Sequence, residues 1–238
     1  MTAKLPPEPK VQGQKPVTMS AGDVLHPPSP DSENHFRIRR VMRERCAALS
    51  AENRNEAARR LAHRLSGFLE SHQIEKLGSY LPFRNEIDPN GFKLLMGPTA
   101  PSIYLPRLMD ETLLFVRWEP QTPMAANRFG IPEPVHGPTL TAEECPCLLL
   151  PLTAFDPFGR RIGSGGGFYD RTLAFRLGSS PRRSPGPLLI GVGYDCQCIE
   201  RIDPNPWDVT LDAIVTDRSW YQDGQTFPDL TWERLVAH

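Results

Sequence analysis

The sequence has no apolar segment long enough to cross a membrane. Its longest apolar run covers residues 147–155 and contains a proline, whereas a transmembrane helix needs roughly 20 apolar residues. The N-terminus also lacks the apolar core of a secretory signal. These absences argue against a membrane protein and a secreted one, and we expect a cytoplasmic chain with no membrane partner.

An excess of either charge is missing as well. The 27 Lys and Arg residues nearly balance the 28 Asp and Glu residues, giving a formal net charge of −1. Nucleic-acid-binding domains carry a marked basic excess, so we expect no nucleic-acid partner. The 238 residues are enough to bury one good core, and we expect no obligate protein partner.

Cysteine is scarce. The odd count of five cysteines, without a secretory signal, argues against a disulfide framework. Two C-x-C pairs, Cys145 with Cys147 and Cys196 with Cys198, could supply four thiolates to a zinc ion. The usual spacing of structural zinc sites is C-x2-C or longer. We therefore favour small buried cysteines at strand ends, with zinc as the minor alternative.

Apolar periodicity is missing from the first 34 residues, which contain seven prolines. Such a composition is typical of a disordered or extended segment. The sequence therefore predicts a disordered Pro-rich N-terminal tail over residues 1–34 and a single folded domain over residues 35–238.

Helical and strand patterns alternate from Phe36 onward. A first helix begins there, and Ser50 is a suitable N-cap for a second. The apolar face of the second helix comprises Ala58, Leu61, Leu65, Phe68 and Leu69. The predicted strands are residues 76–81, 103–105, 113–118, 147–154, 188–194 and 213–216. This alternation predicts an α/β fold with a largely parallel central sheet flanked by helices on both faces.

The most informative segment is RIGSGGGFYD, residues 161–170, with glycines at positions 163 and 165–167. It lies between an apolar strand and a helix expected to begin near Phe168. Glycine permits backbone conformations in which successive N–H groups surround an anion, and a helix N-terminus adds to this effect. Asp170 would repel a phosphate unless a divalent cation lay between them. The segment therefore predicts a magnesium–nucleotide or sugar-phosphate site.

This interpretation competes with a plain flexible turn. The segment is not a P-loop, because no Gly-Lys-Ser/Thr follows, and it does not fit G-x-G-x-x-G. A glycine cluster alone is equally compatible with a turn. However, Arg160, Arg161 and Arg171 surround this one in a nearly neutral chain. The local positive charge favours an anion site.

The glycine segment and its surroundings closely resemble the signature of 5-formyltetrahydrofolate cyclo-ligases, also called methenyltetrahydrofolate synthetases. The resemblance extends from about Phe36 to Trp220, and its motifs follow the family's order. They are residues 80–88 (YLPFRNEID), 104–107 (YLPR), 129–134 (FGIPEP), 150–170, 193–195 (GYD) and 207–212 (WDVTLD). Several spaced motifs in order are far more specific than one glycine loop.

The resemblance implies an ATP- and Mg²⁺-dependent ligase that converts 5-formyltetrahydrofolate into 5,10-methenyltetrahydrofolate. In that family ATP phosphorylates the formyl oxygen, N10 closes onto the activated carbon, and ADP and phosphate are released. The expected partners are thus ATP as co-substrate, Mg²⁺, and 5-formyltetrahydrofolate with or without a polyglutamate tail. Such an enzyme works mainly by positioning its ligands and neutralising phosphate charge.

The resemblance also implies site residues, without assigning a catalytic residue. Those expected to bind ATP are Arg39, Arg161, Ile162, Gly163, Ser164, Gly165, Gly166, Gly167, Phe168 and Tyr169. Those expected to bind the folate are Glu86, Arg107, Gly166 and Phe168. Those expected to serve the metal are Asp170 and Asp208.

One position departs from the family pattern. Its N-terminal helix usually carries Lys-x-x-Leu-Arg, whereas this chain has His35-Phe36-Arg37-Ile38-Arg39. Arg39 occupies the arginine position, and His35 occupies the lysine position. A histidine is mostly neutral at about pH 7 unless its pKa is raised. Either Arg37 or the His35–Arg37 pair then replaces the lysine, or ATP binding is weaker than in the family.

Two other classes of protein stay open. A sugar-phosphate isomerase or coenzyme-A-transferase-like enzyme on the same fold would explain the loop and its arginines, but not the ordered motifs around Glu86, Gly130 and Asp208. A non-catalytic folate-binding relative would explain His35. ATP hydrolysis that depends strictly on added 5-formyltetrahydrofolate distinguishes these alternatives from the ligase.

Overall fold

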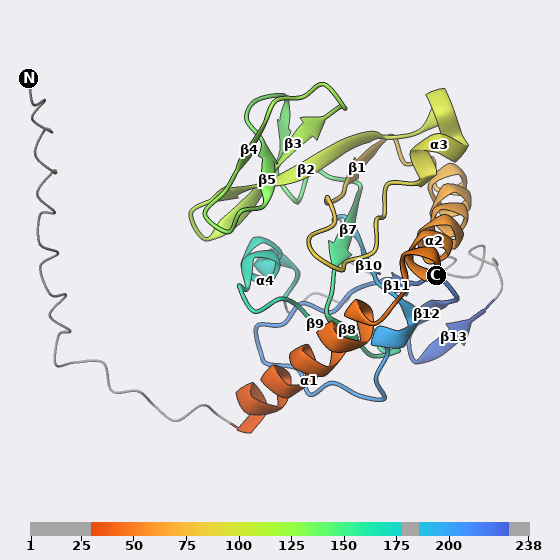
Figure 1. Ribbon diagram of the computed structural model, residues 1–238. Helices are drawn as coiled ribbons and strands as arrows, with labels where there is room; N and C mark the ends of the chain where they lie inside the picture. Colours follow the sequence, from red (N-terminus) through yellow and green to blue (C-terminus); the bar gives the residue numbers. More distant parts are fainter. Residues whose placement is uncertain (1–29, 178–185, 229–238) are drawn as a thin grey trace, which may run out of the picture.

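Two long helices, α1 (Pro30–Ala47) and α2 (Ala51–Ser71), open the computed structural model, which describes residues 30–177 and 186–228 (Figure 1). The Ser50 side chain accepts a hydrogen bond from the Asn53 N–H at 3.1 Å. This bond satisfies a backbone donor in the first turn of α2, so the predicted N-cap is confirmed.

The start of α1 corrects the predicted boundary of the tail. Residues 30–34, which the sequence assigns to the disordered tail, are helical. Proline disrupts a helix interior but suits the first turn, because its fixed φ is helical and its missing N–H has no intrahelical partner there. Pro30 therefore starts the helix. The rest of the predicted tail, residues 1–29, lies outside the described residues.

The described residues contain one main sheet and two small strand pairs. The main sheet has the spatial order β13 (Gln225–Phe227), β12 (Trp220–Gln222), β11 (Ala213–Val215), β10 (Leu188–Val192), β7 (Cys147–Pro151), β1 (Lys76–Gly78), β2 (Ser102–Met109), β3 (Thr112–Trp118) and β6 (Thr139–Leu140). Strands β11, β10, β7, β1 and β2 are parallel, and antiparallel strands extend both edges. The predicted parallel sheet is confirmed in its centre.

The smaller elements lie around this sheet. They are α3 (Phe92–Met96), α4 (Phe168–Thr172), the 3₁₀ turns η1 (Gly97–Thr99), η2 (Ala174–Arg176) and η3 (Asp195–Gln197), and the strand pairs β4 (Met124–Ala126) with β5 (Pro132–Pro134) and β8 (Ala154–Phe155) with β9 (Arg161–Ile162). Helix α4 begins at Phe168, as the sequence predicts.

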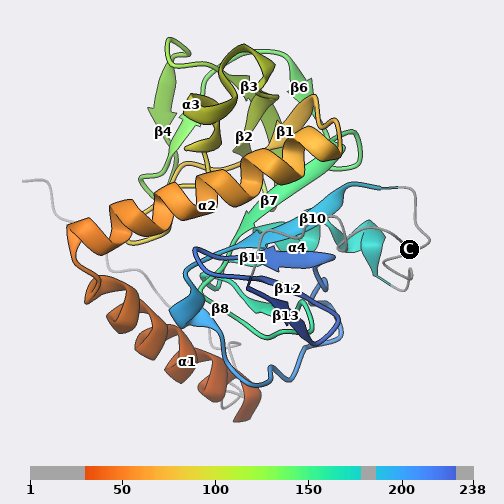
Figure 2. The same cartoon turned by 90° about the vertical axis from the view of Figure 1, so that its right-hand side faces the viewer.

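Helix α2 lies across one face of the sheet (Figure 2), and apolar layers cover both faces. Helix α2 packs Leu65 and Phe68 against one layer, to which Leu149 of β7 belongs. Leu150 of the same strand belongs to the opposite layer, which includes Leu173 at the end of α4. Because successive strand residues point to opposite faces, a strand buried on both sides is apolar throughout. Helices on both faces are thus confirmed.

The predicted strand over residues 147–154 is divided in two. Strand β7 ends at Pro151, and the chain then leaves the sheet. The Thr153 N–H donates to the carbonyl of Ile162 at 2.7 Å, which joins the hairpin β8–β9. The glycine-rich loop therefore follows β9 rather than a central strand. The hairpin carries the loop to the end of the sheet, where α1 lies (Figure 1).

The predicted burial of the cysteines is confirmed only in part. Cys46, Cys145 and Cys147 are buried, Cys198 is half-buried and Cys196 is exposed. Across residues 30–177 and 186–228, no cluster of three or more His, Cys, Asp or Glu side chains could hold a metal ion. The same part of the chain contains no helix of the length and apolarity that a membrane crossing requires.

The turn between β8 and β9 is held by a buried carboxylate. Asp156 accepts hydrogen bonds from the N–H groups of Phe158 at 3.0 Å, Arg160 at 3.1 Å and Ile202 at 2.9 Å. Gly159, inside the turn, has a φ of 83°. A Cβ at this position would lie 2.4 Å from the carbonyl oxygen of Leu211. Only glycine satisfies both the conformation and the close approach.

Gly159→Ala is therefore expected to lower the free energy of unfolding by roughly 2–5 kcal/mol, because left-handed strain and a steric overlap with backbone add together. Gly130→Ala is the matched control, since Gly130 has a φ of 76° but no neighbouring atom within 4 Å of the place a Cβ would take. Gly130→Ala should lower the free energy of unfolding by only about 1–2 kcal/mol. Urea unfolding of both variants measures the difference, and equal losses would contradict the steric argument.

Candidate active site

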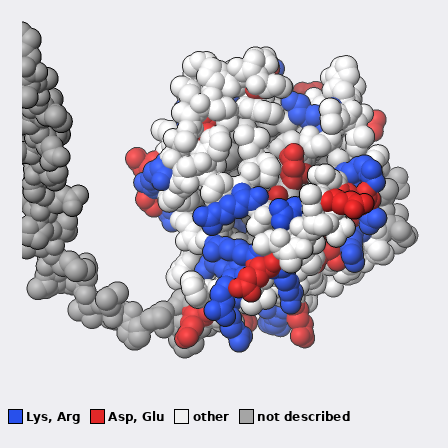
Figure 3. Space-filling view, in the orientation of Figure 1, with Lys and Arg blue, Asp and Glu red and all other residues white. Residues whose placement is uncertain are grey.

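A cavity of about 1110 Å³ lies beyond the carboxyl ends of β1 and β7. Ligands bind at this edge of open parallel sheets. Pro151 to Thr153 after β7 form part of its wall, as do Tyr80 and Leu81 after β1. On the surface, basic side chains gather over α1 and the neighbouring loop below the hollow (Figure 3). One side of the cavity is therefore suited to an anionic ligand.

The glycine-rich loop, residues 163–167, forms the basic wall. Gly165 and Gly167 have φ values of 109° and 67°, which glycine adopts without strain. None of the five backbone N–H groups of this loop donates a hydrogen bond to another described residue. They remain available to a ligand, as the predicted anion site requires.

Three arginines hold the loop through its carbonyl groups. Arg39 donates to the Gly163 oxygen at 2.9 Å, and Arg43 donates to the Ser164 oxygen at 3.3 Å. Arg171 of α4 donates to the Gly166 oxygen at 2.8 Å. Burial, together with the positive charge of Arg43, lowers the pKa of Arg39. The guanidinium groups thus fix the loop and add positive charge beside it.

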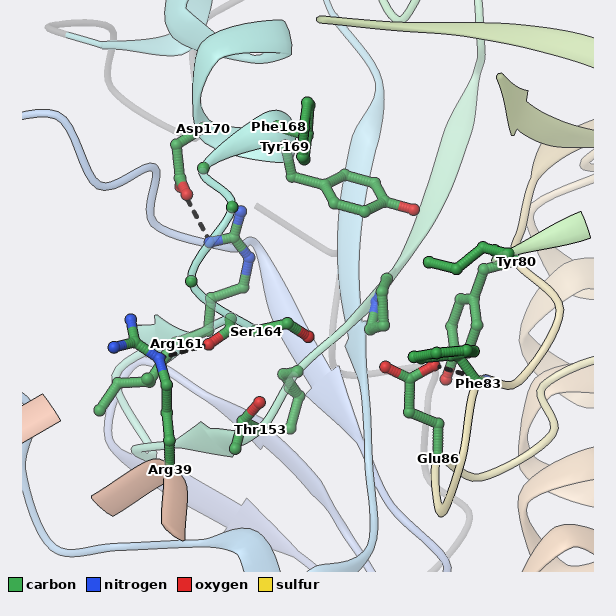
Figure 4. A pocket seen from close by; sticks show the side chains of 18 of the residues that line it. Arg39, Tyr80, Phe83, Glu86, Thr153, Arg161, Ser164, Phe168, Tyr169 and Asp170 are labelled. Carbon is green, nitrogen blue, oxygen red and sulfur yellow. Dashed lines mark hydrogen bonds and ion pairs between the residues drawn. The ribbon is translucent and has the colours of Figure 1, made fainter. Parts of the chain in front are cut away.

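Arg161 and Asp170 connect the two ends of the loop. The buried guanidinium of Arg161 donates to Asp170 Oδ1 at 2.9 Å (Figure 4). The same oxygen accepts a hydrogen bond from the Val209 N–H at 3.3 Å. This bond brings the segment that carries Asp208 alongside α4. The two predicted metal ligands therefore lie on adjoining segments of the cavity wall.

In both Asp170 and Asp208, one carboxylate oxygen accepts hydrogen bonds from the protein. Asp208 Oδ2 accepts hydrogen bonds from the Asn205 N–H at 2.8 Å and from Asn205 Nδ2 at 3.0 Å. The second oxygen of Asp170 and of Asp208 has no hydrogen-bond partner among the described residues. Mg²⁺ in nucleotide sites takes one or two carboxylates and completes its shell with phosphate oxygens and water. Two half-committed carboxylates fit that requirement.

The opposite wall is formed by the segment after β1. The Asn90 side chain accepts from Ser79 Oγ at 2.8 Å and donates to the Tyr80 carbonyl at 2.8 Å, which closes this segment into a loop. Glu86 then accepts one hydrogen bond, from the Phe83 N–H at 3.0 Å. Burial raises the pKa of the Glu86 carboxyl group. Its other oxygen has no hydrogen-bond partner in the described part of the chain.

Tyr169 reaches from α4 across the cavity. Its hydroxyl points toward the wall that carries Tyr80 and Glu86 (Figure 4). This hydroxyl is buried and lacks a hydrogen-bond partner among the described residues. Burial raises the pKa of Tyr169, and the nearby Glu86 charge adds to the effect. A buried hydroxyl without a partner is costly, so this group is placed to bind a polar ligand atom.

Aromatic rings lie between the two polar walls. Phe129 and Phe168 make an edge-to-face contact with ring centroids 5.6 Å apart. The guanidinium carbons of Arg128 and Arg171 lie 5.6 Å and 5.0 Å from the Phe168 ring centroid. These contacts fix the Phe168 ring at the cavity, where it offers an apolar surface to a flat ligand.

Nearly all the residues that the sequence singles out line this one cavity. They are Arg39, Glu86, Arg161, Ile162, Gly163, Ser164, Gly165, Gly166, Gly167, Phe168, Tyr169, Asp170 and Asp208. Arg107 does not. Its neighbours Pro106 and Leu108 on β2 line the cavity, whereas Arg107 donates to the Val135 carbonyl at 3.1 Å.

Other lining residues were not identified from the sequence. Arg43 lies one helical turn after Arg39, so its spacing on the predicted helix could have revealed it. Trp207 is 62% exposed beside Asp208 at the cavity, and its place in the WDVTLD motif was a usable indication. Asn127 lies in a loop and Gln197 in η3, and only the tertiary structure brings them to the site.

Comparison with known proteins gives a consistent result. The profile of the 5-formyltetrahydrofolate cyclo-ligase family matches residues 31–217. The 5-formyltetrahydrofolate cyclo-ligase of Haemophilus influenzae is 33% identical over 190 residues, which cover 78% of this chain and 98% of that protein. The Escherichia coli K12 protein of the same name is 32% identical over 181 residues, covering 74% of this chain and 96% of its own.

Solved structures show the same relationship. The 5,10-methenyltetrahydrofolate synthetase of Aquifex aeolicus superposes with a TM-score of 0.67 at 26% identity, covering 80% of this chain and 93% of that one. The Mycoplasma pneumoniae 5,10-methenyltetrahydrofolate synthetase shares the fold, with a TM-score of 0.62 at 23% identity. The chain belongs to the 5-formyltetrahydrofolate cyclo-ligase family and is an enzyme of the ligase class.

Proposed function

We propose that this chain converts 5-formyltetrahydrofolate into 5,10-methenyltetrahydrofolate with ATP and Mg²⁺, releasing ADP and phosphate. The observation that carries this proposal is a loop whose five backbone N–H groups donate to no other described residue, on one wall of a cavity whose other wall presents Glu86. A phosphate donor and a folate thus have separate binding surfaces in one enclosure. Membership of the ligase family supports the same reaction.

The loop wall is proposed to bind the phosphate groups of ATP. Uncommitted N–H groups and the start of α4 attract anions. Arg39 and Arg43 place positive charge against this loop while holding its carbonyl groups. In this arrangement Arg39 keeps the arginine position of the family pattern, and Arg43 adds a second positive charge from α1 in a chain where His35 takes the lysine position. His35 itself is buried at the edge of the cavity.

Asp170 and Asp208 are proposed to hold the magnesium ion together with phosphate oxygens. When bound, Mg²⁺ would neutralise phosphate charge and orient the transferring group. The role of the chain is to hold the carboxylates in position. Arg161 and the Val209 N–H fix Asp170, and Asn205 fixes Asp208.

The opposite wall is proposed to bind the folate, with or without its polyglutamate tail. The pterin ring carries an amino group and a ring N–H, and the uncommitted Glu86 oxygen can accept from such donors. Phe168 offers a flat apolar contact, and the Tyr169 hydroxyl can donate to a carbonyl oxygen between the two walls. Arg107 has no part in this assignment, because it lies outside the cavity.

The proposed chemistry needs positioning more than covalent participation by the protein. The formyl oxygen attacks the terminal phosphorus of ATP, and the bond between that phosphorus and ADP breaks. N10 then attacks the formyl carbon, and the carbon–oxygen bond breaks to release phosphate. Holding the reactants in the right orientation supplies much of the rate acceleration in such reactions.

The purified chain is expected to form 5,10-methenyltetrahydrofolate, followed by its absorbance, and to hydrolyse one ATP for each product molecule. Reactions that omit ATP, Mg²⁺ or 5-formyltetrahydrofolate are the controls. Tight folate binding without ATP hydrolysis would instead identify a non-catalytic folate-binding protein. Activity on sugar phosphates or coenzyme-A esters without folate turnover would also overturn the proposal.

A further inference from the structure

Two cysteines meet where α1 packs against η3, at the margin of the cavity, and the proposed reaction gives neither of them a role. Cys46 lies near the end of α1, and Cys196 is the middle residue of η3. Their side chains lie close enough to interact directly, and both thiols are free. The adjacent Arg45 donates to the Cys196 carbonyl at 3.4 Å. The two sulfur atoms are therefore neighbours although 150 positions separate them in the chain.

The two thiols have different environments. Cys196 is exposed, whereas Cys46 is only 4% exposed. The interaction with Cys46 lowers the pKa of Cys196 to about 7, with Arg45 favouring the thiolate and partial burial and Asp217 opposing it. The same interaction, together with burial, raises the pKa of Cys46. An accessible thiolate next to a protected thiol is the arrangement of a reactive cysteine and its resolving partner.

We propose that Cys46 and Cys196 form a reversible disulfide, in which Cys196 reacts first with a small-molecule disulfide such as oxidised glutathione and Cys46 resolves the adduct. The Cys196 thiolate attacks one sulfur of the oxidant, which releases one glutathione thiolate and leaves a mixed disulfide. Cys46 gives up its proton, attacks the Cys196 sulfur and displaces the second glutathione. Two protein thiols are oxidised by two electrons, and one disulfide is reduced to two thiols.

This bond would join α1 to the second half of the fold. Helix α1 carries Arg39 and Arg43, which hold the glycine-rich loop. A cross-link between residues 46 and 196 closes a loop of about 150 residues, and such long loops restrict the unfolded chain strongly. The oxidised protein is therefore expected to melt several degrees higher than the reduced protein.

The experiment incubates the folded full-length chain with oxidised glutathione and measures intact mass and disulfide-linked peptides. The wild type is expected to lose two hydrogens, keep no glutathione and yield a peptide linking Cys46 to Cys196. Cys46→Ser should retain one glutathione on Cys196, because the resolving thiol is gone. Cys196→Ser should gain no adduct at Cys46, which is buried.

Cys198→Ser is the matched control, because Cys198 is the other member of the C-x-C pair but takes no part in the proposed disulfide. It should oxidise like the wild type. The thermal shift should disappear after reduction. A linkage between Cys196 and Cys198, a lasting glutathione adduct on the wild type, or five unreacted thiols would each overturn the proposal. The wild-type peptide map gives this answer even if Cys46→Ser does not fold.

Discussion

Asp208→Asn is expected to raise the Mg²⁺ concentration needed for half-maximal activity by about tenfold or more, since even outer-shell partners of a metal affect its affinity this strongly. The amide keeps the size of the carboxylate but loses its charge. Asp170→Asn should reduce activity more than Asp208→Asn does, because Asp170 also neutralises the buried Arg161 guanidinium at 2.9 Å. Leaving a buried charge without its partner is strongly destabilising. Titration of activity with Mg²⁺ at saturating ATP measures both effects.

The double variant gives the sharper test. If the two carboxylates serve one ion, their combined effect should be less than the product of the single effects, because residues that act as a unit are not additive. Asp203→Asn is the control, since the Asp203 side chain is 84% exposed. A normal Mg²⁺ dependence in both single variants would show that the metal is held elsewhere.

Glu86→Gln is expected to raise the KM for 5-formyltetrahydrofolate by roughly 10- to 100-fold, the range for one lost hydrogen bond to a charged group. The KM for ATP should stay within about twofold, because Glu86 lies on the wall opposite the glycine loop and charge-assisted contacts are local. The amide oxygen can still accept from the Phe83 N–H, so the loop itself should persist. Initial rates with each substrate varied in turn measure the two constants.

The pH dependence provides a second readout for the same group. Burial raises the Glu86 pKa, so Glu86 takes up a proton at higher pH than an ordinary glutamate as the solution is acidified. The protonated acid no longer attracts the folate donors, and the wild-type KM for folate should rise as pH falls toward that pKa. Glu86→Gln should lack this rise. Glu75→Gln, an exposed change at the amino end of β1, should behave like the wild type. A selective loss of ATP affinity in Glu86→Gln would contradict the assignment.

Local features were the most predictable from the sequence. The Ser50 cap, the α2 face and the start of α4 depend on residues close together in the chain, and each was found correctly. The glycine loop was recognisable because glycine is the residue type that adopts positive φ values without strain. The resemblance then brought distant motifs together, and the structure places Glu86 and Asp208 in the same cavity as the loop.

Features that depend on tertiary contacts were not predictable in this way. The predicted tail boundary was wrong because Pro30 counts among the prolines that indicate the tail. Proline also occurs in the first turn of helices, and only the structure shows that Pro30 does so here. Arg107 is expected at the folate site from its motif, but its hydrogen bond to the Val135 carbonyl, a contact between distant segments, holds it away from the cavity lining. The Tyr169 hydroxyl is buried without a hydrogen-bond partner among the described residues, and this depends on how the folded chain surrounds it. Short edge strands such as β12 and β13 have little sequence pattern of their own.

The order of strands in the sheet also has a consequence for biosynthesis. Strand β7 pairs with β1 on one side and with β10 on the other. While the ribosome is still adding the residues after Pro151, the first part of the sheet can form but its β7 edge has no neighbour. This edge carries the apolar Leu148, Leu149 and Leu150, and unpaired apolar edges promote aggregation. Nascent chains stalled before Leu188 should therefore bind chaperones more strongly than chains that extend beyond Val215.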